Sequence, residues 1–269
     1  RIFATVEQKS RIARGMPPSY SNLVIHDDGM IYTTSINTTS QQIRKINSVG
    51  KNVFKSDSFG EGFDDEGNMV IPHFVDLAVD KKGIVSALEQ RSGRIYQYDQ
   101  DGNVLTVFGG IGYKKGQFGF PTAIEVDDDG NIYVLDRTQN NIQVFEPTSF
   151  IKLVHEAVKC QYEGRYNEAQ ELWMETLKID ANYSLAHKGI GTVLLKEKRW
   201  KEAMEEFKAA NDIAGYSLAF DNYCHQVFRL YFGFIFIGIV IAAYAMYKLI
   251  IQAKKVADEV IGRVDKYIR

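Results

Sequence analysis

The sequence is poor in cysteine, with two residues among 269, and it lacks an excess of charge of either sign. Cys160 and Cys224 lie far apart and belong to no CxxC motif, which excludes a small disulfide framework and a cysteine zinc or redox motif. Lys and Arg number 32 against 34 Asp and Glu, for a formal net charge of -2. The basic residues are scattered rather than clustered, so we expect no nucleic-acid partner.

Catalytic motifs are also missing, because no GxSxG, Walker or correctly placed GxGxxG pattern occurs. One acidic series has the spacing of a calcium loop: Glu125, Asp127, Asp129, Gly130 and Asp136. The end of this series is better explained as a buried strand over residues 132–136, and its last acidic residue is Asp rather than Glu. We therefore predict no metal, no cofactor and no catalytic residue in this chain.

Residues 1–147 contain a repeat in which an apolar run, a polar turn and a second apolar run follow one another. The turn glycines Gly29, Gly83 and Gly130 can adopt the positive φ that closes a hairpin, while Asp side chains accept hydrogen bonds from turn amides. We predict a third strand after each hairpin, over residues 43–47, 94–99 and 141–146, and a fourth over 53–56 and 104–108. A sheet with two apolar faces must stack on others, and radial stacking gives a propeller.

The last unit, from Pro121 to Phe145, resembles an NHL repeat, and the middle unit keeps Pro72, Asp80 and Gly83 of that pattern. The resemblance implies an all-β, NHL-type propeller of which residues 1–147 supply about three blades. The strand at Ile132–Leu135 is apolar at every position, so we expect it to be buried on both faces. We expect the remaining blades upstream of Arg1.

Residues 148–216 change to a helical period. A shift of 34 residues superposes Ala157 on Gly191, Tyr166 on Trp200, Ala169 on Ala203 and Trp173 on Phe207. Small residues would let paired helices approach, and the large aromatic residues would fill the space between pairs. This period and pattern resemble TPR repeats, and we predict two TPR-like helical hairpins.

Residues 217–252 are predicted to form a capping helix that continues into a transmembrane span. Leu230–Tyr247 contains no charged residue, and the apolar segment extends to Ile251 if Lys248 reaches the interface. Residues 253–269 have apolar residues at every fourth position, which predicts an amphipathic helix. This tail could lie on the membrane, pack on another helix or lead into a further domain.

The balance of Lys and Arg beside the span predicts its orientation. Only Arg229 lies close on the N-terminal side, whereas several basic residues follow the span. We therefore expect a bacterial-type, single-pass protein of the cell membrane with a cytoplasmic tail and extracytoplasmic N-terminal domains. That location requires a signal sequence or a span upstream.

The resemblance to the NHL and TPR families implies a binding or scaffold protein that recognises a protein, peptide or glycan, possibly as a subunit of a larger membrane assembly. We expect no enzyme activity; the alternative is an extracytoplasmic propeller hydrolase or lyase, lactonase-like, with its catalytic residues in missing blades. The candidate ligand-binding residues at the propeller mouth are Glu89, Arg91, Asp136 and Arg137. The candidate partner-binding residues on the first helix of each hairpin are Val158, Tyr162, Lys188 and Lys196.

Overall fold

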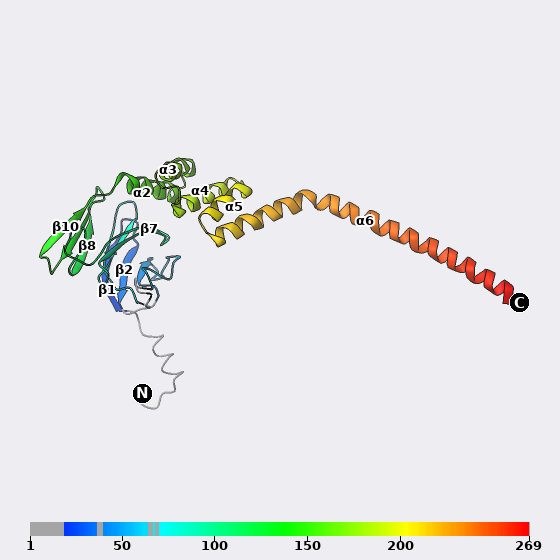
Figure 1. The fold of residues 1–269 in the computed structure, drawn as a ribbon, viewed down its shortest axis with the longest axis horizontal. Helices are drawn as coiled ribbons and strands as arrows, with labels where there is room; N and C mark the ends of the chain where they lie inside the picture. Colours follow the sequence, from blue (N-terminus) through cyan, green and yellow to red (C-terminus); the bar gives the residue numbers. More distant parts are fainter. Residues whose placement is uncertain (1–18, 37–39, 64–66, 68–69, 269) are drawn as a thin grey trace, which may run out of the picture. The chain divides into compact units, whose positions relative to one another are not determined.

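The computed structural model describes residues 19–36, 40–63, 67 and 70–268, with side chains up to Ala257. The chain divides into two compact units, Arg1–Ile190 and Gly191–Arg269. The first unit holds the sheets and the first helices, and the second holds the later helices, including α6 (Figure 1). Residues 1–18 of the predicted propeller portion lie outside the described residues.

Three antiparallel sheets make up the β part of the first unit. The first contains β1 (Ser19–Ile25), β2 (Ile31–Ile36) and β3 (Ile43–Ile46) in the order β1-β2-β3. The second contains β4 (Phe74–Val79), β5 (Val85–Glu89), β6 (Arg94–Tyr98) and β7 (Val104–Gly109), and the third contains β8 (Pro121–Val126), β9 (Ile132–Asp136) and β10 (Asn141–Phe145). Each strand pairs with the next along the chain, and this arrangement fits a partial propeller.

The turn chemistry expected from the sequence is confirmed. In the second sheet the Asp80 carboxylate accepts hydrogen bonds from the amides of Lys82 and Ile84, at 2.9 and 2.8 Å. Gly83 in this turn has φ +80°, and Gly29 and Gly130 in the equivalent turns have +78° and +82°. The sequence signal therefore sets the place of each hairpin because only a few residue types satisfy a turn of this shape.

The predicted fourth strand over residues 104–108 is confirmed as β7, whereas the one over residues 53–56 is wrong. There the pairing stops after a single bridge between Ile46 and Asn52. The Asn52 side chain explains the difference, because its Oδ1 accepts hydrogen bonds from the amides of Lys45 and Phe54, at 3.2 and 3.3 Å. Side-chain hydrogen bonds of this kind compete with a strand ladder.

Two apolar clusters fill the spaces between neighbouring sheets. Tyr32 and Ile43 of the first sheet pack with Phe74 and Leu77 of the second. The other face of the second sheet contributes to a cluster with the third sheet: Ala78, Leu88, Ile95, Phe118, Ile124, Ile132 and Val134. The second sheet is therefore buried on both faces.

The exposure of β9 in the third sheet contradicts one prediction. Along β9 the side chains alternate between buried and exposed, and Tyr133 and Leu135 lie at the exposed positions. The prediction that this strand is buried on both faces is wrong because, in the part of the chain that is described, no sheet packs on that side.

Helices follow the sheets: α2 (Ser149–Tyr162), α3 (Tyr166–Ile179) and α4 (Ser184–Lys196), of which the last begins in the first unit and ends in the second. The Thr148 hydroxyl caps α2 by accepting a hydrogen bond from the Ile151 amide at 3.3 Å. The Trp173 indole of α3 lies against Gly189 of α4, where an added Cβ would come within 2.3 Å of its Nε1. Glycine is therefore required where these helices meet.

In the second unit, α5 (Trp200–Ala209) is followed by α6 (Ile213–Ile268). Phe207 of α5 packs so closely on Gly191 and Gly215 that a Cβ at either glycine would lie within 3 Å of its ring. The expected helix near Ser217 thus begins at Ile213 and continues to Ile268 without a break. Of the described helices, α6 has the length and composition of a candidate membrane span.

The same set of ion pairs, in which one arginine contacts two glutamates, occurs at the turn of each helix pair, and we call it the turn clamp. Arg165, at the start of α3, pairs with Glu163 at 2.7 Å and with Glu168 at 2.5 Å. Thirty-four residues later, Arg199 pairs with the equivalent Glu197 and Glu202, at 3.0 and 2.5 Å. The repeat period found in the sequence is therefore also present in the side-chain contacts.

Candidate functional site

Two of the predicted mouth residues are carboxylates at equivalent strand ends. Glu89 ends β5, where its Oε1 accepts hydrogen bonds from the His73 and Arg91 amides, at 2.9 and 3.2 Å. Its Oε2 accepts from the Ser92 amide at 2.6 Å and from the Ser92 hydroxyl. Glu89 therefore braces its turn against the segment that enters β4.

Asp136 has the same role at the end of β9. Its carboxylate accepts hydrogen bonds from the amides of Gly119, Phe120, Thr138 and Gln139. Burial alone would raise the pKa of Asp136, but these four amides outweigh burial and hold it below its usual range. The carboxylate thus fixes the entry into β8 to the end of β9.

The two predicted arginines follow these carboxylates and are exposed. Arg91 Nη1 lies 3.4 Å from the carbonyl oxygen of Ile71, and the side chain lines a hollow of about 210 Å³ together with Glu61, Glu89 and Arg94. The Arg137 amide donates to the Phe120 carbonyl at 3.0 Å. Arg91 and Glu89 line the same hollow, and a ligand-binding role for the four residues stays a prediction.

The predicted partner-binding residues occupy different surroundings. Val158 is buried within α2, and Lys196 is exposed at the end of α4. Tyr162 is exposed, with the Lys45 ammonium of β3 lying 5.7 Å from its ring centroid. Lys188 Nζ donates to Asn103 Oδ1 of the second sheet at 2.9 Å. Tyr162 and Lys188 thus lie where helices contact sheets.

This contact zone, which we call the sheet–helix junction, is the candidate functional site. We define it by Lys82, Gln97, Asn103 and Leu105 on the second sheet and its turns, and by His155, Glu156, Tyr183 and Lys188 on the helical side. Tyr183 donates from its hydroxyl to the Leu105 carbonyl at 2.8 Å. All these residues belong to the first unit.

A buried hydrogen bond lies within the junction. His155 Nε2 of α2 lies 3.1 Å from Gln97 Oε1 of β6, and the Gln97 amide donates to the Ser86 hydroxyl at 3.1 Å. Burial, with a smaller effect from the nearby Lys82 charge, lowers the pKa of His155 to about 4. The imidazole is therefore neutral at pH 7 and supplies the Nε2–H that Gln97 can accept.

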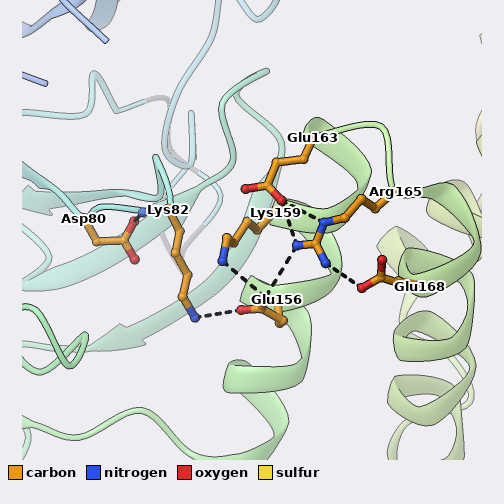
Figure 2. A network of polar contacts seen from close by, with 7 residues as sticks. All are labelled: Asp80, Lys82, Glu156, Lys159, Glu163, Arg165 and Glu168. Atoms are coloured by element: carbon orange, nitrogen blue, oxygen red, sulfur yellow. Dashed lines mark hydrogen bonds and ion pairs between the residues drawn. The ribbon is translucent and has the colours of Figure 1, made fainter. Parts of the chain in front are cut away.

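A charged network borders this buried pair. Figure 2 shows Lys82 extending from the β4–β5 turn to Glu156 on α2, where the two charges are 3.2 Å apart. Glu156 also pairs with Lys159 at 3.4 Å, and Arg165 Nη2 comes within 4.0 Å of it. The network continues through Arg165 to Glu163 and Glu168 at the α2–α3 turn (Figure 2). One chain of ion pairs thus runs from a sheet turn to a helix turn.

Two hollows flank the junction. One, of about 300 Å³, is lined mainly by apolar residues of the sheets and of the start of α2, including Phe108, Phe145 and Phe150. The other, of about 590 Å³, lies on α2 and α3 and is lined by acidic, basic and apolar residues around Cys160. Among the described residues, no group of three or more His, Cys, Asp and Glu side chains could hold a metal ion.

Sequence analysis did not single out His155, Lys82, Gln97 or Glu156 as site residues. A signal is present, since His155 is a polar residue among the buried apolar residues of α2. The partners of these residues lie 58 residues or more away along the chain, so periodicity alone could not identify them.

No protein-family model and no curated protein matches the chain. Solved structures do match. One is a catalytically inactive virginiamycin B lyase from Staphylococcus aureus with quinupristin, at 16% identity over 50% of this chain and 43% of that chain, with a TM-score of 0.34. A protein of unknown function from Bacteroides caccae matches at 15% identity over 48% and 46%, with a TM-score of 0.30. A streptogramin B lyase matches at 13% identity over 50% and 57%, with a TM-score of 0.27.

The chain thus spans about half the length of the solved structures that it matches. The prediction that it is not an enzyme is corrected here, because two of these structures are lyases. At this identity and TM-score the likeness concerns the fold and assigns no activity or substrate to the chain. The alternative of a propeller hydrolase or lyase is not better supported than a binding role.

Proposed function

We propose that this chain is a membrane-anchored recognition protein in which the sheets and the first helices act as one binding unit for a protein, peptide or glycan. The observation that carries the proposal is the sheet–helix junction. Four polar contacts, from Lys82, Gln97, Asn103 and Leu105, join the second sheet to the helices. A junction of this kind lets loops on the sheets and faces of the helices bind a partner together.

The finer part of the proposal concerns the repeat families. We assign the sheets to an NHL-type propeller and the helices to TPR-type hairpins. Support for the second assignment comes from the turn clamps of Arg165 and Arg199, which recur at the 34-residue TPR period. Both repeat types present extended surfaces to partners.

The proposed location rests on α6 and on its flanking charges. Because more basic residues closely follow the apolar segment than precede it, we place the tail in the cytoplasm and the sheets and first helices outside. Within a larger membrane assembly, the span would pack on partner helices. Labelling with a membrane-impermeant maleimide tests the orientation: in intact cells, the exposed Cys224 should react and a Lys254→Cys variant lacking Cys224 should not.

Charge reversal at the junction tests the recognition role. The chain is purified from native membranes in mild detergent, and co-purifying proteins and glycans are quantified by mass spectrometry. The same is done for Lys82→Glu, for Glu156→Lys and for the double exchange. We expect a stoichiometric partner with the wild type and less of it with each single reversal. The exchange should recover part of the yield, because position 156 also faces Lys159 and Arg165.

Glu202→Lys is the matched control, since Glu202 pairs with Arg199 in the second unit and lines neither of the two hollows. Its partner yield should stay at the wild-type level. Equal yields from all variants would contradict the joint binding unit, and the absence of any stoichiometric partner would contradict recognition itself.

A further inference from the structure

A small hollow lies at the turn between β5 and β6. It has a volume of about 210 Å³, and we call it the β5–β6 hollow. Its walls come from the second sheet and from the segment that joins the first sheet to the second. The residues that define it are Glu61, Phe63, Pro72, Arg91, Arg94 and Tyr96. This volume suits one sugar ring or one amino-acid residue rather than a larger compound.

One wall of the hollow is a polar network that the fold holds in place. Arg94 of β6 pairs with Glu61, and the Tyr96 hydroxyl is hydrogen-bonded to the Arg94 side chain and to the Glu61 backbone. The Tyr96 ring is buried and packs edge-on against Phe74, with 5.7 Å between the ring centroids. Because these contacts exist before a ligand arrives, little conformational freedom is lost on binding.

Arg91 supplies the charge that a ligand can use. Within the described ranges of the chain, its guanidinium forms no ion pair, and Nη1 makes one long contact of 3.4 Å with the Ile71 carbonyl. The nearby Glu89 carboxylate is buried and accepts hydrogen bonds from three amides and from the Ser92 hydroxyl, so it needs no guanidinium partner. A guanidinium with unused N–H donors can bind a carboxylate through two parallel hydrogen bonds.

The hollow also offers an apolar surface and a hydrogen-bond acceptor. The Phe63 ring is 59% exposed, and Val70 and Pro72 line the same hollow. An exposed aromatic ring of this kind can pack against the C–H face of a sugar ring. The Glu61 carboxylate uses Oε2 for Arg94, so that Oε1 can accept a hydrogen bond from a ligand hydroxyl.

We propose that the β5–β6 hollow binds an acidic sugar of a glycan, with the sugar carboxylate on Arg91, a hydroxyl group on Glu61 and the ring on Phe63. This inference rests on the proposed recognition role, of which it names the ligand class. A guanidinium, an acceptor and an aromatic ring match the carboxylate, the hydroxyl groups and the C–H face of one acidic sugar. The C-terminal carboxylate of a peptide would use the guanidinium alone.

Binding of small sugars to the intact protein tests the proposal. The protein is placed in phosphatidylcholine nanodiscs, which carry no sugar head groups, and saturation-transfer NMR measures its affinity for methyl glucuronide and for methyl glucoside. The two sugars differ only in a carboxylate in place of a hydroxymethyl group. We expect the glucuronide to bind at least about tenfold more tightly, as one charge-assisted hydrogen bond predicts.

Two variants assign the binding to its residues. Arg91→Gln should reduce the affinity for methyl glucuronide about tenfold, to that of the glucoside, and should leave the glucoside affinity unchanged. Phe63→Ala should weaken the binding of both sugars by a similar factor. Because both side chains are exposed, the variants should keep the circular dichroism spectrum of the wild type.

Lys115→Gln is the matched control, because it removes an exposed positive charge that does not line the hollow. Its affinity for both sugars should equal that of the wild type. Equal binding of the two sugars by the wild type would overturn the proposal, as would an equal loss in Arg91→Gln and Lys115→Gln. Tighter binding of acetyl-dialanine, which has a free C-terminal carboxylate, than of methyl glucuronide would also overturn it.

Failure of this inference is distinguishable from failure of the recognition role. If a stoichiometric partner co-purifies with the chain and methyl glucuronide does not bind, the acidic-sugar inference is wrong and the recognition role remains. If no partner co-purifies, that result contradicts the recognition role, and the sugar measurement still decides whether the hollow binds an acidic sugar.

Discussion

The two helix pairs use the same repeat for different surroundings. A shift of 34 residues places Gly189 and Ile190 of α4 where α2 has His155 and Glu156. On α2 these positions contact the second sheet through Gln97 and Lys82. On α4 the glycine instead receives the Trp173 indole of α3. The repeat thus determines each hairpin, and the residues that depart from it determine what the hairpin packs against.

The largest effect on stability should come from replacing the buried aromatic residue of each helix pair. We expect Trp173→Ala and Phe207→Ala each to lower the free energy of unfolding by about 3–5 kcal/mol, because both side chains are buried and leave cavities. Hydrogen exchange on the intact protein in detergent should distinguish the effects of the two variants. Trp173→Ala should deprotect the second sheet as well as α2 and α3, since α2 holds the junction. Equal loss of protection in that sheet with Phe207→Ala would contradict the comparison.

A smaller effect on stability, which depends on pH, should distinguish α2 from α4. The pKa of His155 is about 4 in the folded chain, against 6.5 for an ordinary histidine. The unfolded chain therefore binds more protons in this window, and stability present above pH 6.5 should be lost as the pH falls toward 4. The loss amounts to at most about 3 kcal/mol.

His155→Leu is the variant that isolates this effect. It should lower stability at pH 7, since Gln97 loses its partner, and should remove this part of the pH dependence. Urea unfolding at pH 7, 6 and 5 measures both. An unchanged slope with pH in the leucine variant would show that other groups set the acid response, such as the Asp136 and Glu156 carboxyls, whose pKa values are lowered in the folded chain.

The turns within the two pairs differ by one residue. Gly164 and Lys198 occupy equivalent positions with φ +79° and +64°. Lysine in this region is strained, so Lys198→Gly should stabilise the second pair by about 1 kcal/mol. Gly164→Lys should destabilise the first pair by a similar amount. Thermal unfolding of both variants measures the two shifts, and shifts of the same sign would refute this explanation.

The smallest effect on stability should come from removing the arginine of a turn clamp. Arg165 and Arg199 lie at the surface, so Arg165→Met and Arg199→Met should each lower stability only slightly, and this effect should disappear at high salt. Arg165→Met should have the larger cost, because Arg165 also approaches Glu156 of the junction. Unfolding at low and high ionic strength measures the difference.

Local chemistry explains why much of the fold could be predicted. The turns at Asp80 and Gly83, the strands beside them and the helices of the 34-residue repeat depend on residues close in sequence. The strand expected after Asn52 failed because one side chain took the place of the ladder. Burial of Leu135 was also predicted wrongly, since exposure depends on which sheet lies beside it.

The candidate site could be predicted only in part. Glu89, Asp136, Tyr162 and Lys188 were singled out as binding residues, and the structure shows that each contacts another part of the chain. The junction pairs lay beyond sequence reasoning because they join residues 58 or more positions apart, such as Gln97 and His155. A lone polar residue on a buried helix face indicates a partner without identifying it.

The central claim is that the sheets and the first helices form one unit, and a distance measurement tests it most directly. Spin labels at Asp129 in the β8–β9 turn and at Glu171 on α3, in a chain carrying Cys160→Ala and Cys224→Ser, report on the two sides of the junction. In native lipid at pH 7.5, we predict a single narrow distance distribution that broadens in the His155→Leu and Glu156→Lys variants. A broad wild-type distribution, unchanged in those variants, would contradict the claim and would show that the helices turn freely about the link after β10.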